Sequence, residues 1–75
     1  MKVKVLFFAQ LRDQFGMNET IVELPEGIFV KDMVPYVGNS LASSLRFAVN
    51  ENFVEPEHEL NDGDTVALMT PVSGG

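Results

Sequence analysis

The sequence predicts an α+β fold in which a mixed β-sheet packs against one main helix. Two observations support this prediction. Segments near both ends of the chain alternate in hydropathy or are rich in β-branched and aromatic residues, which is typical of strands. One segment in the middle, starting near Ile28, has the 3.6-residue period of a helix. With 75 residues, of which 45% are hydrophobic, the chain is long enough for one small domain.

The first strand is expected over residues 2–9, and its two faces differ. The face expected to lie against the core is wholly apolar and holds the odd positions Val3, Val5, Phe7 and Ala9. The opposite face is polar where the strand begins, at Lys2 and Lys4, and apolar where it ends, at Leu6 and Phe8. The strand therefore carries apolar side chains on a face that the core does not use.

The second strand is expected over residues 19–24, because a Pro-Glu-Gly turn follows it. Residues 10–18 include a glycine and an asparagine and are interpreted as a connection without regular structure. The first two strands are therefore expected to form a hairpin.

The helix is expected to begin at Val30, because apolar residues recur at i, i+3, i+4 and i+7 up to Val37. Pro35 lies inside this pattern, and a proline in a helix interior costs about 3 kcal/mol unless it lies in the first turn. The helix is therefore short, kinked, or begins later than the pattern suggests. The sequence Gly38-Asn39-Ser40 indicates a stop, and apolar residues within 41–45 suggest one or two further turns.

Three short strands complete the chain. Two are expected over residues 47–50 and 53–55, on either side of a turn, and the last over residues 65–69 after the tight turn Asp62-Gly63-Asp64. Strand, strand, helix and three strands is the order of the β-grasp, or ubiquitin-like, fold, in which the first and last strands lie parallel at the sheet centre. We therefore expect a β-grasp domain over residues 1–69 and a flexible tail over residues 70–75.

Composition excludes several classes of function. The net charge of −6 disfavours nucleic acid and anionic membranes as partners and favours a basic protein surface. The absence of cysteine excludes disulfides, a thiolate nucleophile and thiolate metal sites, and His58 is the only histidine. No apolar run approaches the roughly 20 residues of a transmembrane helix, and no signal-peptide cleavage pattern follows Met1. A cytoplasmic location is expected.

No internal set of side chains predicts catalysis or metal binding. Asp62 and Asp64 flank a glycine as in a cation loop, but calcium needs about six or more oxygen ligands, so a solvated turn is the preferred interpretation. Residues 55–59 hold three glutamates and His58, and an exposed acidic loop explains them better than a metal or acid–base site. The serines within residues 40–44 are interpreted as helix-cap or surface residues rather than nucleophiles.

The Gly74-Gly75 ending has a coherent chemical use. A main-chain carboxylate is a poor electrophile, but adenylation by ATP gives an acyl-adenylate that a sulfur or amine nucleophile can attack. Two residues without Cβ let a tail pass through a narrow channel. Extended residues 70–75 would reach roughly 20 Å at about 3.3–3.6 Å per residue, and Pro71 lowers the entropy lost on insertion. The alternative is an inert end.

Three segments resemble molybdopterin synthase small subunits, of the MoaD/ThiS class of ubiquitin-like sulfur carriers. They cover essentially the whole chain in order: residues 4–12 (KVLFFAQLR), residues 48–54 with AVN and FV, and residues 60–75 with LNDGDTVA and PVSGG. The chain departs from the family pattern at Pro35, where relatives carry a regular helix, and at Met69 and Thr70, where relatives often have an aromatic residue and a proline.

The resemblance implies a sulfur-carrying function in molybdenum cofactor biosynthesis. An ATP-dependent, ubiquitin-activating-like adenylyltransferase would adenylate Gly75, and a sulfur-donor enzyme would convert it to a thiocarboxylate. The carrier would bind no cofactor itself, since ATP is used by the activating enzyme. It would dock on the large subunit in a heterotetramer, with Pro71, Val72, Ser73 and Gly74 in that subunit's active site, and donate sulfur to cyclic pyranopterin monophosphate. The chain would be a co-substrate rather than a catalyst.

Strand alternation predicts a docking surface for this partner. If Val66 and Leu68 face the core, then Thr65, Ala67 and Met69 face outward. Ala67 and Met69 would then form an apolar patch with Leu6 and Phe8. The family resemblance adds Phe53 as an apolar docking position. Contiguous exposed apolar surface usually marks an interface. The alternatives are that a loop covers this patch or that Phe8 turns inward.

Three other functions remain in competition. The chain could carry sulfur for thiamine thiazole synthesis, although such relatives usually lack the Phe-Phe-Ala-x-x-Arg opening and the Pro-Val-x-Gly-Gly ending. It could be a ubiquitin-like modifier that forms an isopeptide bond through Gly75. It could also be a β-grasp interaction module with an inert tail, in which case removal of Gly74 and Gly75 would leave its activity unchanged.

Overall fold

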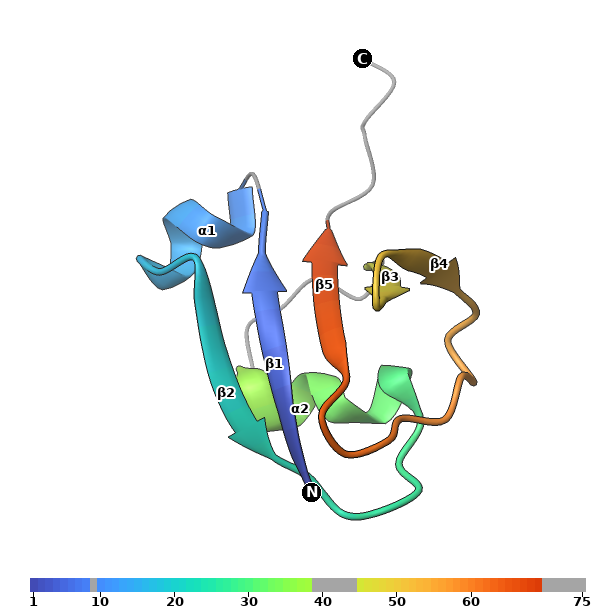
Figure 1. The fold of residues 1–75 in the computed structure, drawn as a ribbon. Helices are drawn as coiled ribbons and strands as arrows, with labels where there is room; N and C mark the ends of the chain where they lie inside the picture. The colour runs from blue at the N-terminus through green and yellow to red at the C-terminus, as the bar shows by residue number, and fades with distance from the viewer. Residues whose placement is uncertain (9, 39–44, 70–75) are drawn as a thin grey trace.

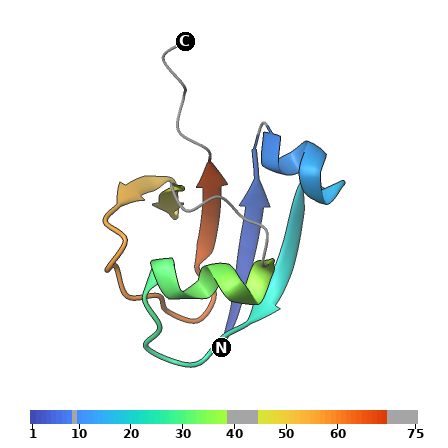
Figure 2. The same cartoon turned by 180° about the vertical axis from the view of Figure 1, so that it is seen from behind.

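The computed structural model describes residues 1–8, 10–38 and 45–69. A five-stranded sheet forms one layer, and the helical segment in the middle of the chain crosses one face of it (Figures 1 and 2). The strands are β1 (Lys2–Phe7), β2 (Glu19–Glu23), β3 (Arg46–Val49), β4 (Asn52–Val54) and β5 (Thr65–Met69). The helices are α1 (Gln10–Phe15), the 3₁₀-helix η1 (Val30–Met33) and α2 (Val34–Val37).

The strand order is β2-β1-β5-β3-β4. β1 and β5 are parallel neighbours at the centre, and the other neighbouring pairs are antiparallel. This is the β-grasp arrangement, so the predicted fold is confirmed. The predicted pairing of β1 with β2 and the parallel pairing of the first and last strands are confirmed with it.

The core lies between the sheet and the helical layer. Val3, Val5 and Phe7 of β1 are buried, and so are Val66 and Leu68 of β5, as the alternation predicts. The helical segment contributes Val30 and Met33, α1 contributes Leu11, and the loops contribute Leu24 and Leu60. Ala9, the last residue predicted for this face, lies outside the described residues.

The interpretation of residues 10–18 as an irregular connection is wrong, because α1 occupies its first part. Leu11 is buried in the core, and the Phe15 ring stacks on that of Phe7 with 4.8 Å between ring centroids. Six residues are too few for a helical period to stand out in the sequence. Gly16, with φ of 68°, follows the helix and donates its N–H to the carbonyl oxygen of Arg12.

Pro35 lies in the first turn of α2, where its missing N–H disrupts no helical hydrogen bond. The apolar pattern begins earlier, at Val30, because η1 precedes α2 and presents its residues to the same core. Of the three alternatives that the sequence left open, the structure shows a short α-helix that begins later than the apolar pattern. Gly38 donates its N–H to the carbonyl oxygen of Val34 and caps α2, and the further turns predicted within residues 41–45 lie largely outside the described residues.

Gly38→Ala tests how tightly α1 packs against the end of α2. A Cβ at this position would lie 2.8 Å from the Phe15 Cε1 atom, and the Phe15 ring is itself held against Phe7. We expect a loss of about 1–3 kcal/mol in the free energy of unfolding, measured by urea denaturation. In a Phe15→Leu background the same substitution should cost less, and an equal cost in both backgrounds would contradict this packing.

Candidate functional site

A row of apolar side chains crosses the face of the sheet opposite the helices. Residues paired across a ladder point to the same face. Leu6 of β1 pairs with Ala67 of β5, Ala67 pairs with Ala48 of β3, and Ala48 pairs with Phe53 of β4. The register therefore brings together on one outer row residues that are up to 61 positions apart in the chain.

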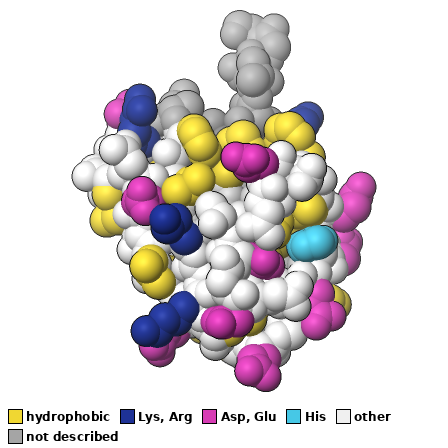
Figure 3. Space-filling model, in the orientation of Figure 1, with side chains coloured by type: hydrophobic (Ala, Val, Ile, Leu, Met, Phe, Trp, Pro, Cys, Tyr) yellow, Lys and Arg dark blue, Asp and Glu magenta, His cyan; other side chains and the backbone are white. Residues whose placement is uncertain are grey.

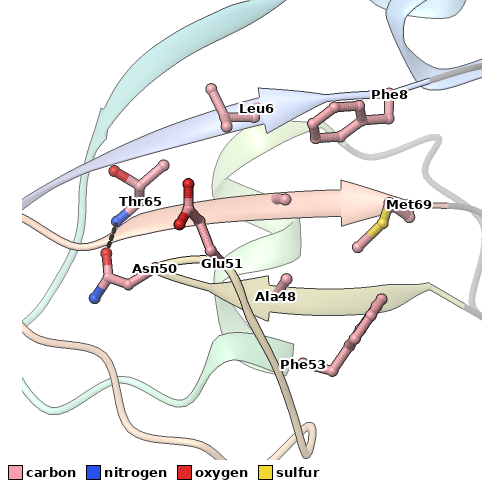
Figure 4. Close-up of a pocket in the computed structure, with 9 residues that line it drawn as sticks. Leu6, Phe8, Ala48, Asn50, Glu51, Phe53, Thr65 and Met69 are labelled. Carbon is pink, nitrogen blue, oxygen red and sulfur yellow. Dashed lines mark hydrogen bonds between the residues drawn. The ribbon is translucent and has the colours of Figure 1, made fainter.

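This row forms the floor and one wall of a hollow with a volume of about 570 Å³. We call it the docking hollow. Its lining residues are Leu6, Phe8, Ala48, Asn50, Glu51, Phe53, Thr65, Ala67 and Met69 (Figure 4). The small side chains of Ala48 and Ala67 leave the centre low, whereas the exposed rings of Phe8 and Phe53 stand beside it. Figure 3 shows hydrophobic side chains gathered over the same end of the sheet.

All five described residues of the predicted docking surface line this hollow: Leu6, Phe8, Phe53, Ala67 and Met69. Phe8 is 46% exposed and Phe53 is 71% exposed, so neither ring turns into the core. The other predicted residues, Pro71, Val72, Ser73, Gly74 and Gly75, lie outside the described residues. Their role, and that of the hollow in docking, stays a prediction.

The predicted docking surface did not include four residues of the docking hollow, Ala48, Asn50, Glu51 and Thr65, although the alternation placed Thr65 on the outer face. Ala48 lies between Phe47 and Val49, and an uninterrupted apolar run does not show which residue faces outward. The pairing of Ala48 with Ala67 shows it, but register depends on tertiary structure. The turn that holds Asn50 and Glu51 was predicted, but its position beside β5 depends on the pairing of β3 with β5.

A polar network holds this turn in place. The Asp64 carboxylate accepts one hydrogen bond from the Asn61 backbone N–H at 2.8 Å and one from the Asn50 side-chain amide at 3.0 Å. The Asn50 side-chain oxygen in turn accepts the Thr65 N–H at 3.1 Å (Figure 4). The turn between β3 and β4 is thereby tied to the beginning of β5.

The prediction of a solvated turn over residues 62–64 is wrong for Asp64, which is only 8% exposed. Its carboxylate is buried because it satisfies donors from two loops rather than from water. Asp62 fits the prediction, since it lies on the surface and accepts the Lys2 backbone N–H at 2.8 Å. Gly63 allows the turn through its φ of 86°.

The described residues hold no group of three His, Asp or Glu side chains arranged to share a metal ion. His58 and the glutamates of residues 55–59 are therefore not gathered into such a group. The described helices lack the length and apolar character needed to cross a membrane. The candidate site among the described residues is therefore the apolar surface of the docking hollow.

Sequence and structure both show relatives of this chain. The model of the ThiS family matches residues 5–75. The molybdopterin synthase sulfur carrier subunit of Chlamydomonas reinhardtii is 36% identical over the full length of both chains. That of Escherichia coli (strain K12) is also 36% identical, over 97% of this chain and 99% of the relative. A solved Pyrococcus furiosus structure, described as a molybdopterin converting factor, subunit 1, superposes with a TM-score of 0.78 at 34% identity, covering 96% of this chain and 99% of that one.

Asp64→Ala tests the polar network at the edge of the docking hollow. The substitution leaves the Asn50 amide and the Asn61 N–H without their acceptor, so we expect a loss of about 1–3 kcal/mol in the free energy of unfolding. Asp62→Ala is the matched control, since it removes an equal charge from the same turn but only one exposed hydrogen bond. If urea denaturation gives both variants the same stability, the network does not hold the turn.

Proposed function

The chain belongs to the ThiS family, and we propose that it is the sulfur carrier subunit of a molybdopterin synthase, with Gly75 as the residue that carries the sulfur. The observation that carries this proposal is the position of the docking hollow. Met69 lines the hollow and is the last residue of β5, so the Gly-Gly tail follows in the sequence directly from the surface that would bind the partner.

The proposed chemistry takes place at the C-terminal carboxylate. A carboxylate oxygen of Gly75 attacks the α-phosphorus of ATP, pyrophosphate leaves, and an acyl-adenylate forms. Hydrosulfide, or an equivalent delivered by a sulfur-donor enzyme, then attacks the acyl carbon and AMP leaves. The product is a thiocarboxylate, whose sulfur is transferred to cyclic pyranopterin monophosphate. ATP is a substrate of the activating enzyme, and this chain needs no cofactor of its own.

The large subunit is the proposed partner of the docking hollow. Burial of the exposed Phe8 and Phe53 rings against it would remove apolar surface from water and hold the tail in one direction. Relatives that are 36% identical over nearly their whole length carry the name of sulfur carrier subunit, which supports assembly with a second subunit. We propose a heterotetramer in the cytoplasm, where an ATP-dependent adenylyltransferase can activate the tail.

The carrier chemistry is tested by the intact mass of the chain. After incubation with ATP, a competent activating enzyme and sulfide, we expect the mass to rise by the difference between one sulfur and one oxygen atom. Deletion of Gly75 should abolish this rise, since the reacting carboxylate then sits on another residue. An unchanged mass, with the activating enzyme active on a known carrier, would contradict the proposal, and conjugates on lysines would indicate a modifier instead.

The docking surface is tested by Phe8→Asp and Met69→Asp. A buried charge in an apolar interface is costly, so each variant should bind the large subunit at least about tenfold more weakly in calorimetric titration. Both side chains lie outside the core cluster, so thermal unfolding should change little.

The control for this experiment is Ile21→Asp. Ile21 is 63% exposed on β2 and does not line the docking hollow, so the same apolar-to-acid change there should leave the affinity near that of the wild type. Equal affinity of all three variants for the large subunit would contradict the proposal that the docking hollow binds it. Unfolding of the Phe8 and Met69 variants would contradict it too.

A further inference from the structure

Glu51 lies at the rim of the docking hollow in an unfavourable backbone conformation. It is the second residue of the two-residue turn between β3 and β4, and its φ is 73°, following a φ of 51° at Asn50. Turns with two positive φ angles favour Asn at the first position and Gly at the second. Asn50 fits this preference and Glu51 does not, so the chain keeps a strained residue where glycine would be easier.

The Glu51 carboxylate has no ionic partner in the part of the chain that the structure describes. Lys4 is on the same outer face, beside Thr65, but its Nζ lies 3.5 Å from a carboxylate oxygen of Glu19. Arg46 pairs with Met69 at the opposite end of β3 from the turn. Neither of these two cations is therefore paired with Glu51.

Hydrogen bonds of the neighbouring residue hold the backbone of Glu51 beside the docking hollow. Asn50, its neighbour in the turn, is tied through its side chain to Asp64 and to the Thr65 backbone. Figure 4 shows Glu51 on the side of the sheet that carries Leu6 and Phe8, where it lines the docking hollow. A protein that covers the hollow would take this carboxylate partly out of water, which is costly without a cation beside it.

We propose that Glu51 is a specificity-determining residue, whose carboxylate pairs with an arginine or lysine side chain that the large subunit places in the docking hollow. This rests on the proposed function. Charge complementarity supports it, since the chain has a net charge of −6 and a basic surface is the natural partner. A partner without that cation would leave the carboxylate unpaired and be rejected.

Glu51→Gln tests the proposal because it keeps the size of the side chain and removes its charge. We expect the affinity for the large subunit to fall roughly tenfold at low salt. Affinity of the wild type should decrease with rising salt more steeply than that of Glu51→Gln, since salt screens an ion pair. Glu57→Gln is the matched control, because Glu57 is exposed outside the hollow and its replacement changes the net charge equally.

Glu51→Gly separates binding from folding. Glycine adopts a positive φ without strain, so the melting temperature should stay the same or rise while the affinity falls as in Glu51→Gln. Equal affinities for Glu51→Gln and Glu57→Gln would overturn the proposal, and so would a weaker affinity with an unchanged salt dependence. Failure of the proposed function is distinct, because the wild type itself would then fail to bind the large subunit.

Discussion

The parallel pairing of β1 with β5 is the constraint on which the rest of the molecule depends. Val5 pairs with Val66 at the sheet centre, and both side chains are fully buried. Once these residues face the core, the pleat directs Leu6 and Ala67 to the outer face. Because the strands run in the same direction, their carboxyl ends meet at one edge of the sheet. Core burial, the docking hollow and the origin of the tail therefore follow from one pairing.

Besides the pairing of β1 with β5, the docking hollow depends on a polar network that holds the β3–β4 hairpin in place. β4 has only three residues and lies at the edge of the sheet, so its ladder alone would hold Phe53 weakly. The hydrogen bonds among Asn50, Asp64 and the Thr65 backbone tie the hairpin to the central strand. Apolar pairing thus positions the floor of the hollow, and a small buried polar network positions its wall.

The predictable parts of the fold are the segments whose hydropathy pattern is regular over several consecutive residues. Alternation in β1 and β5 gave the core and the outward direction of Leu6 and Ala67, and the known fold then gave their proximity. α1 was not predictable, since six residues are too few to show a period and its stability comes from tertiary contacts of Leu11 and Phe15. The burial of Asp64 was hidden for a similar reason, because its donors come from Asn50 and Asn61 through the folded arrangement.

The two alanines at the floor of the docking hollow explain why the exposed apolar face of the sheet is hollowed rather than flat. Alanine is a poor strand former, yet Ala48 and Ala67 occupy the central row of the outer face. Larger residues there would fill the hollow and leave a flat sheet, whereas alanines keep it open beside the exposed rings of Phe8 and Phe53. Glu51 adds a charged group to the lining of this hollow, and charged groups in an interface favour selectivity and fast association more than a long-lived complex.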